Sequence, residues 1–82
     1  MKHTIFGVHV TDRVKNVPAV QAVLTKYGCS IHIRLGIHDI DQETCASTGL
    51  LLLDVVGPEV EDLYKELHAI EGVDIKRMEF PG

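Results

Sequence analysis

The sequence predicts an α+β fold in which two helices alternate with four strands. Two segments carry apolar residues at the three- and four-residue spacing of amphipathic helices, and four show the alternation or the apolar run of strands. These segments follow one another as strand, helix, strand, strand, helix, strand, and the two halves match in length and pattern. This order predicts a ferredoxin-like βαββαβ fold, with both helices on one face of a four-stranded antiparallel sheet.

The first strand and the first helix occupy the opening third of the chain. Apolar residues alternate along residues 4–10, which predicts a strand with both faces partly covered. Asn16 is suited to cap a helix, because its side chain can accept from a free backbone amide of the first turn. An apolar stripe then runs along residues 17–27, and Gly28 stands where a helix commonly ends.

The second strand has the clearest pattern in the sequence. Isoleucine or leucine alternates with polar residues along 31–37, so we expect one apolar face and one polar face. His32, Arg34 and His38 are predicted to share the polar face. Residues 39–48 are polar and irregular, which predicts a long hairpin loop.

The second half repeats the pattern of the first. Residues 49–56 are apolar on both faces, which predicts a central strand. Residues 60–70 form an amphipathic helix with acidic residues in and before its first turn, and Gly72 ends it. Residues 73–80 form the last strand, whose apolar residues change parity, so we expect a bulge near residues 76–77 or fraying at the terminus.

The chain is short and mildly acidic. Its 82 residues are 45% hydrophobic and 24% charged, and we expect residues 1–82 to form a single domain. The net charge of -4, with eight dispersed lysines and arginines, argues against nucleic-acid binding. The longest apolar run, residues 49–53, is far shorter than the roughly 20 residues of a membrane span. We therefore expect a cytoplasmic protein in which Cys29 and Cys45 are free thiols.

The third strand also predicts self-association. If Leu51 and Leu53 face the helices, then Leu50, Leu52 and Val56 face outward, and in the other register the first pair is exposed. Either way, leucines remain on the face of the sheet that the helices do not cover, and such apolar patches usually mark association. We expect a homodimer or higher oligomer, built through the sheet and closed by twofold symmetry.

Several functions hosted by ferredoxin-like folds are excluded by missing residues. The central strands offer no aromatic residue besides Phe6, which argues against RNA binding by base stacking. The segment TDRVKN after the first strand has neither the CxxC of a metal carrier nor the glycines of a phosphate-cradling loop. No nucleophile has a local base, so we expect no catalytic residues and no enzyme activity.

Charged and backbone groups near the strand ends are candidates for binding a small ligand. Asp12 and Arg13 follow the first strand, where loops often bind ligands by their charged ends, although a solvated turn would look the same. Arg34 and Gly36 add a guanidinium and accessible backbone. The candidate ligand contacts are therefore Asp12, Arg13, Arg34 and Gly36.

His32, His38 and Cys45 are the alternative site, for a divalent transition metal. Imidazole and thiolate ligands together suit nickel, zinc or cobalt. The two histidines stand about 20 Å apart along one strand, so an ion would need Cys45 or a ligand from another subunit. The plainer interpretation is that these are polar residues of a half-exposed strand and its loop, with no cofactor bound.

The chain resembles an ACT-type regulatory domain. The first strand followed by Asp12 and Arg13, the helix ending at Tyr27 and Gly28, and the return through residues 30–33 carry this resemblance. The Pro-Gly pair that usually follows the acidic residue in that family is absent. The resemblance implies an ACT-like fold and regulation through a bound ligand.

A closer resemblance is to the iron-only hydrogenase system regulators, small stand-alone proteins with an ACT-like fold. The matching pieces are IRLG at residues 33–36, the leucine-rich third strand and IEGVDIK at residues 70–76. This resemblance implies regulation linked to hydrogenase maturation or expression, without catalytic residues. More distantly, the region of the candidate metal ligands is similar to the ligand-binding domain of nickel-responsive regulators, although their His-x-His pair is absent.

From these observations we expect a non-enzymatic, homo-oligomeric regulatory module that binds a small ligand or a protein. A purely structural subunit is a weaker alternative, and a transition-metal sensor is the alternative from another class. Regulation requires only that a ligand bind one state of the oligomer better than another.

Overall fold

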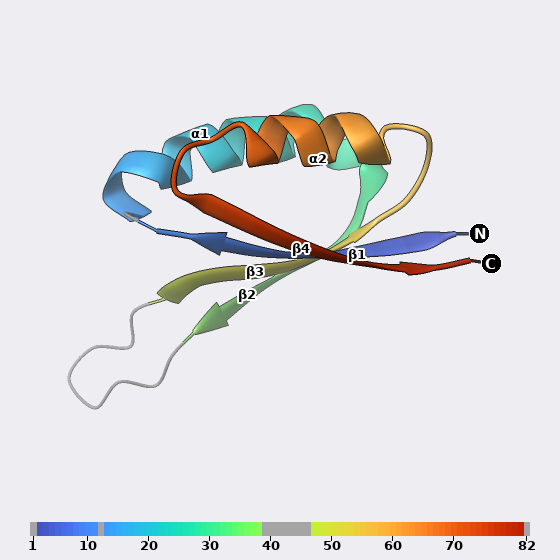
Figure 1. Ribbon diagram of the computed structural model, residues 1–82, viewed down its shortest axis with the longest axis horizontal. Helices are drawn as coiled ribbons and strands as arrows, with labels where there is room; N and C mark the ends of the chain where they lie inside the picture. Colours follow the sequence, from blue (N-terminus) through green and yellow to red (C-terminus); the bar gives the residue numbers. More distant parts are fainter. Residues whose placement is uncertain (1, 12, 39–46, 82) are drawn as a thin grey trace.

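The computed structural model describes residues 2–11, 13–38 and 47–81. It contains four strands, two α-helices and a short 3-10 helix within those ranges (Figure 1). Their bounds are β1 (His3–Val10), α1 (Arg13–Lys26), η1 (Gly28–Ser30), β2 (Ile31–His38), β3 (Ser47–Val55), α2 (Val60–His68) and β4 (Val73–Phe80). This order confirms the predicted α+β, ferredoxin-like βαββαβ arrangement.

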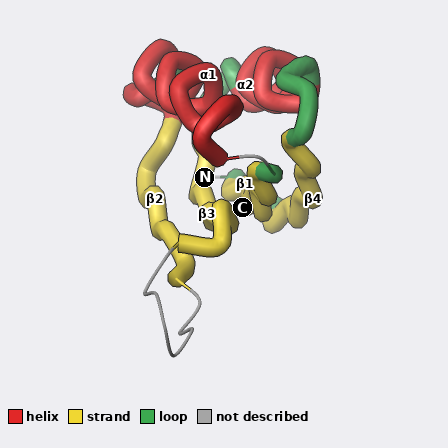
Figure 2. Tube along the Cα trace, turned by 90° about the vertical axis from the view of Figure 1, so that its left-hand side faces the viewer, coloured by secondary structure: helices red, strands yellow, loops and turns green. Residues whose placement is uncertain are grey.

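The four strands form one antiparallel sheet in the order β2-β3-β1-β4. Both helices cover the same face of this sheet, with α1 lying toward β2 and α2 toward β4 (Figures 1 and 2). The opposite face has no helix over it among the described elements, and we call it the open face. The two edge strands are therefore β2 and β4, each beside one helix.

The core lies between the sheet and the helices, and the central strand β1 contributes most to it. Phe6 and Val8 are fully buried, and the Phe6 ring meets the Tyr64 ring edge-on at a centroid distance of 5.9 Å. Each such buried apolar side chain contributes roughly 1.5–3 kcal/mol. The buried apolar residues are Phe6, Val8, Val10, Val20, Leu24, Tyr27, Leu53, Val55, Leu63, Leu67 and Ile75.

Helix α1 begins earlier than the sequence predicts. It starts at Arg13, so Asn16 lies inside the helix and does not cap it. The Asn16 side chain donates to the Thr11 carbonyl at 2.6 Å, and the Thr11 amide and hydroxyl both donate to the Gly72 carbonyl at 2.8 Å. The prediction that Asn16 caps the helix is therefore wrong, because its side chain bonds to Thr11, which in turn joins the end of β1 to the turn before β4.

The predicted bulge in the last strand is wrong, because β4 pairs with β1 without a register shift. The change of parity has another cause, since Arg77 occupies an inner position and Met78 points to the open face. The bulge lies in β2, where Ile31 pairs with Val55 and Ile33 with Asp54, which leaves His32 as the extra residue.

This bulge also changes the faces of β2. After it, Ile33 stands opposite Asp54 on the open face, and Arg34 stands opposite the buried Leu53 on the helix-facing side. The prediction that His32 and Arg34 share one face is therefore wrong, because an extra residue shifts the alternation by one position.

Candidate functional site

The structure places two of the four predicted ligand contacts in full. Arg34 and Gly36 are exposed residues of the edge strand β2. Arg13 is the first residue of α1, but its side chain lies outside what the structure describes, and so does the whole of Asp12.

Arg34 lines a pocket between α1 and the β2 edge of the sheet. The pocket has a volume of about 210 Å³. Apolar side chains from α1, β1 and β3 form most of its wall, and Gln21 and Arg34 are its polar side chains. The lining residues are Val10, Val17, Val20, Gln21, Arg34, Gly49 and Leu51. The sequence pattern predicts Arg34 as a ligand contact but not the helix residues that complete the pocket, because the bulge that turns Arg34 toward α1 is not visible in the alternation.

A second arginine occupies the matching place at the other edge. Arg34 pairs with Leu53, Leu53 with Phe6, and Phe6 with Arg77. The four residues form one row across the sheet, and the two arginines stand at its ends. Arg77 donates to both oxygens of Glu61 on α2, at 3.0 and 2.7 Å, and to Glu79 at 2.5 Å. These hydrogen bonds, chiefly those that Glu61 accepts, raise the pKa of the Arg77 guanidinium, and they lower the pKa of the Glu61 carboxyl.

Arg77 is also packed against rings. Its guanidinium lies 5.0 Å from the centroid of the Tyr64 ring and 5.7 Å from that of Phe6. Cation–π contacts of this kind stabilise the position of the Arg77 side chain further, beyond its two ion pairs. Arg34, by contrast, forms no ion pair with any residue that the structure describes.

The predicted metal ligands are not brought together by the described part of the chain. His32 is exposed at the bulge of β2, His38 ends β2 with a side chain that is not described, and Cys45 lies outside the described residues. Within residues 2–11, 13–38 and 47–81, no group of three histidine, cysteine or acidic side chains is placed to hold a metal ion. The metal prediction therefore stays a prediction.

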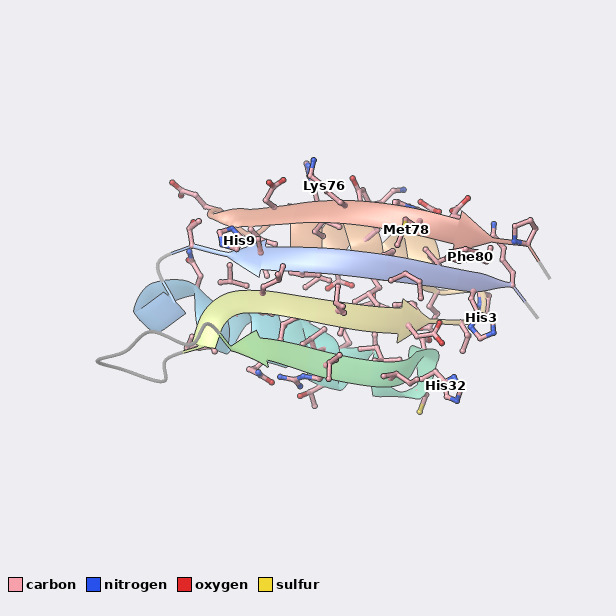
Figure 3. All side chains as sticks on the ribbon, turned by 90° about the horizontal axis from the view of Figure 1, so that it is seen from below. His3, His9, His32, Lys76, Met78 and Phe80 are labelled. Carbon is pink, nitrogen blue, oxygen red and sulfur yellow. The ribbon has the colours of Figure 1, made fainter. Side chains whose placement is uncertain are left out.

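His32 instead joins a cluster on the open face that sequence analysis missed. His3 Nδ1 lies 2.9 and 3.0 Å from the two carboxylate oxygens of Asp54, and His32 Nδ1 lies 3.5 Å from Oδ2 (Figure 3). The hydrogen bond from His3 is the main cause that lowers the pKa of Asp54. The three residues come from three strands, so only the strand register reveals the cluster.

The open face also carries the exposed apolar side chains. The strand register places all five of the large exposed ones on this face, with exposed fractions between 36% and 59% (Figure 3). They are Ile33, Leu35, Leu52, Met78 and Phe80. Of the two registers that the sequence leaves open, β3 adopts the one in which Leu51, Leu53 and Val55 point inward and Leu52 is exposed.

A larger pocket of about 420 Å³ lies at the other end of the sheet, near the start of α2. Its charged side chains already have partners, since Lys2 Nζ is 3.9 Å from Glu79 and Glu61 is bound to Arg77. It therefore offers no single unbalanced charge to a ligand, in contrast with the pocket at Arg34.

Comparison with known proteins supports the fold alone. No protein-family model matches the chain, and no curated protein matches it. Among solved structures, the chain is similar to the uncharacterized protein TM1266 from Thermotoga maritima, with a TM-score of 0.72. The two share 24% sequence identity over 99% of this chain and 100% of that one. In the described part of this chain, neither helix is long and apolar enough to cross a membrane.

Proposed function

We propose that this protein is a non-enzymatic regulatory module that forms a homo-oligomer through the open face of its sheet and acts by binding a small ligand or a protein. One observation carries the proposal: every large apolar side chain that is exposed among the described residues stands on the open face. Exposed apolar side chains gathered on one face in this way mark interaction surfaces.

A second copy of the chain is the partner that suits this face. The apolar residues are spread over β2, β3 and β4, so the same face of another copy can cover residues of all three strands. Two sheets pack face to face about 10 Å apart with their side chains interdigitated, and twofold symmetry then places the same patch on both partners. Burial stabilises the pair by about 25 cal/mol for each Å² of apolar surface.

In this proposal the module regulates by binding and not by catalysis. A ligand that binds one packing of the oligomer better than another shifts the balance between them, which is all that regulation requires. We propose that it works in the cytoplasm, where a free and exposed thiol such as that of Cys29 is expected. The ACT-like resemblance of the sequence suggests a ligand-controlled regulator, and the closer resemblance suggests a partner in an iron-only hydrogenase system.

The oligomer is tested by sedimentation velocity at micromolar concentration with Met78→Glu. Met78 is exposed, so a charge there costs the single chain little but lies within the proposed interface. We expect the wild-type protein to sediment as a dimer or larger and the variant as the 9.1 kDa monomer. Ala22→Glu, an exposed site on α1, is the matched control and should keep the wild-type state. A monomeric wild type, or an unchanged Met78→Glu oligomer, would contradict the proposal.

We propose transition-metal binding by His32, His38 and Cys45 as the second candidate function, because imidazole and thiolate ligands suit such ions. The structure describes the side chain of His32, which is exposed and therefore accessible to an ion. Thermal unfolding of metal-stripped protein with added Ni²⁺ or Zn²⁺ tests it, because a bound ion raises Tm. Loss of that shift in both His32→Ala and Cys45→Ser would support metal binding, and its persistence in either would count against this set.

A further inference from the structure

We propose that the pocket between α1 and the β2 edge binds a small monocarboxylate with a short aliphatic body. The carboxylate pairs with Arg34, and the aliphatic part lies against Val17, Val20 and Leu51. This inference rests on the proposed function, because it names the class of small ligand that the regulatory module would take.

Arg34 carries a positive charge that no described residue neutralises. The helix beside it, α1, has the sequence RVKNVPAVQAVLTK, which contains three cationic residues and no acidic one. The helix beside Arg77 has Glu61 available, and Glu61 binds that arginine with two hydrogen bonds. The fold therefore supplies a carboxylate to one edge arginine and leaves the other without one among the described residues.

The position of Arg34 in the sheet directs its charge at the pocket. Arg34 opposes the buried Leu53 on the helix-facing side, which directs it toward the pocket and away from the open face. Arginine pairs with a carboxylate through two parallel hydrogen bonds, and such charge-assisted pairs are stronger than neutral ones.

The apolar wall and the small volume of the pocket indicate the size and the aliphatic character of the ligand. Val10 and Val20 are buried, Val17 and Leu51 are partly buried, and Gln21 supplies one neutral amide. The pocket volume of about 210 Å³ is below the roughly 300–1,000 Å³ of most ligand pockets, so the ligand must be small. An inorganic anion would leave the valine and leucine side chains uncovered, whereas a branched aliphatic acid covers them.

The probe for this proposal is 3-methylbutanoate, titrated into the full chain and followed by calorimetry and by amide NMR shifts. We expect binding that moves the signals of Gln21, Arg34 and Leu51. Removal of the cation in Arg34→Gln should weaken binding by about ten- to a hundredfold, the usual loss of a charge-assisted pair. The control Lys65→Gln removes an exposed cation on α2 and should change affinity by less than about twofold.

A second variant keeps the proposal falsifiable if Arg34→Gln folds poorly. Gln21→Glu gives α1 the carboxylate that α2 already has, so it should pair with Arg34, raise Tm and abolish binding of the probe. 3-Methylbutanol, which lacks the charge, and phosphate, which lacks the aliphatic body, should both fail to bind. Unchanged affinity in Arg34→Gln or Gln21→Glu, equal binding of phosphate, or no binding of the probe at millimolar concentration would overturn the proposal.

The same samples separate this proposal from the proposed assembly. The pocket opens on the helix side of the sheet, whereas the assembly uses the open face. An intact oligomer that does not bind the probe overturns only the carboxylate pocket. A monomer that binds the probe overturns only the oligomer.

Discussion

The arginines at the two edges of the sheet differ in whether their charge is paired within the fold. Each edge strand carries one arginine on the helix-facing side, at the two ends of one row of paired residues. At the β4 edge, Arg77 is held by two glutamates and two aromatic rings, and only 23% of its side chain is exposed. At the β2 edge, Arg34 is exposed beside a small apolar pocket.

The difference comes from the helix next to each strand. Helix α2 begins with Glu61 and Asp62, and acidic residues are favoured there by the helix dipole, so Arg77 has a carboxylate within reach. Helix α1 has no acidic residue in its first turn or beyond. Arg77 is thus neutralised by the helix beside it, whereas Arg34 has no ion-pair partner among the described residues.

The largest expected effect on stability comes from replacing the glycine in the turn before β4. Gly72, before β4, has φ of +84°, and an added Cβ would clash with the Asn16 amide and lie 2.9 Å from Thr11 Oγ1. We expect Gly72→Ala to lower the free energy of unfolding by about 2 kcal/mol or more.

Gly36 on β2 is the matched control for that substitution. An added Cβ there meets only Leu51 Cδ2 at 3.7 Å, so Gly36→Ala should change the free energy of unfolding by less than about 0.5 kcal/mol. Urea unfolding measures both variants. Equal losses at the two glycines would show that the turn before β4 is not held as the hydrogen bonds of Thr11 indicate.

Substitution of the two edge arginines should have a smaller effect on stability. Arg77→Gln removes the ion pairs and the ring contacts together, so we expect a loss of about 1 kcal/mol in the free energy of unfolding. Arg34→Gln removes no ion pair within the described residues, and its stability without ligand should equal that of the wild type within error. Thermal unfolding of both variants checks this, and a larger loss in Arg34→Gln would contradict the comparison.

The smallest expected effect is a change with pH in how much Arg77 contributes to stability. Arg77 lowers the pKa of Glu61 below its usual 4.5, so this pair stabilises the fold above about pH 4.5 and loses its effect as pH falls through the lower pKa of the folded state. The difference in Tm between the wild type and Arg77→Gln should therefore narrow as pH is lowered from 7 to 3. Because Glu61 is 64% exposed, solvent screens the pair and the change is small. The difference for Arg34→Gln should stay flat over this range, and a matching narrowing there would show that Arg34 has a carboxylate partner.

The order of the elements could be predicted because periodicity is a local property of the chain. The alternation in residues 4–10 and 31–37 and the apolar stripe ending at Tyr27 each depend on neighbouring residues only. The start of α1 differs from the prediction because the Asn16 side chain, which suits a helix cap, here donates to the Thr11 carbonyl from inside the helix.

The candidate site could be predicted only in part. Arg34 and Gly36 were selected for their position on β2, and Arg34 does line a pocket. Gln21 and the valines of α1 gave no signal, since an amphipathic helix has the same pattern whether it covers a core or a pocket. The His3 and Asp54 contact was missed because the two residues are 51 positions apart in the sequence.

The sequence by itself determined the strand and helix order, the acidic balance and the apolar character of both faces of β3, because composition and spacing are properties of the unfolded chain as well. The tertiary structure alone decided which edge arginine is neutralised, which histidines meet Asp54 and which apolar residues are left exposed. The physical reason is register: one extra residue at His32 reverses the faces of the strand that follows it, and only the pairing of β2 with β3 shows where that residue lies.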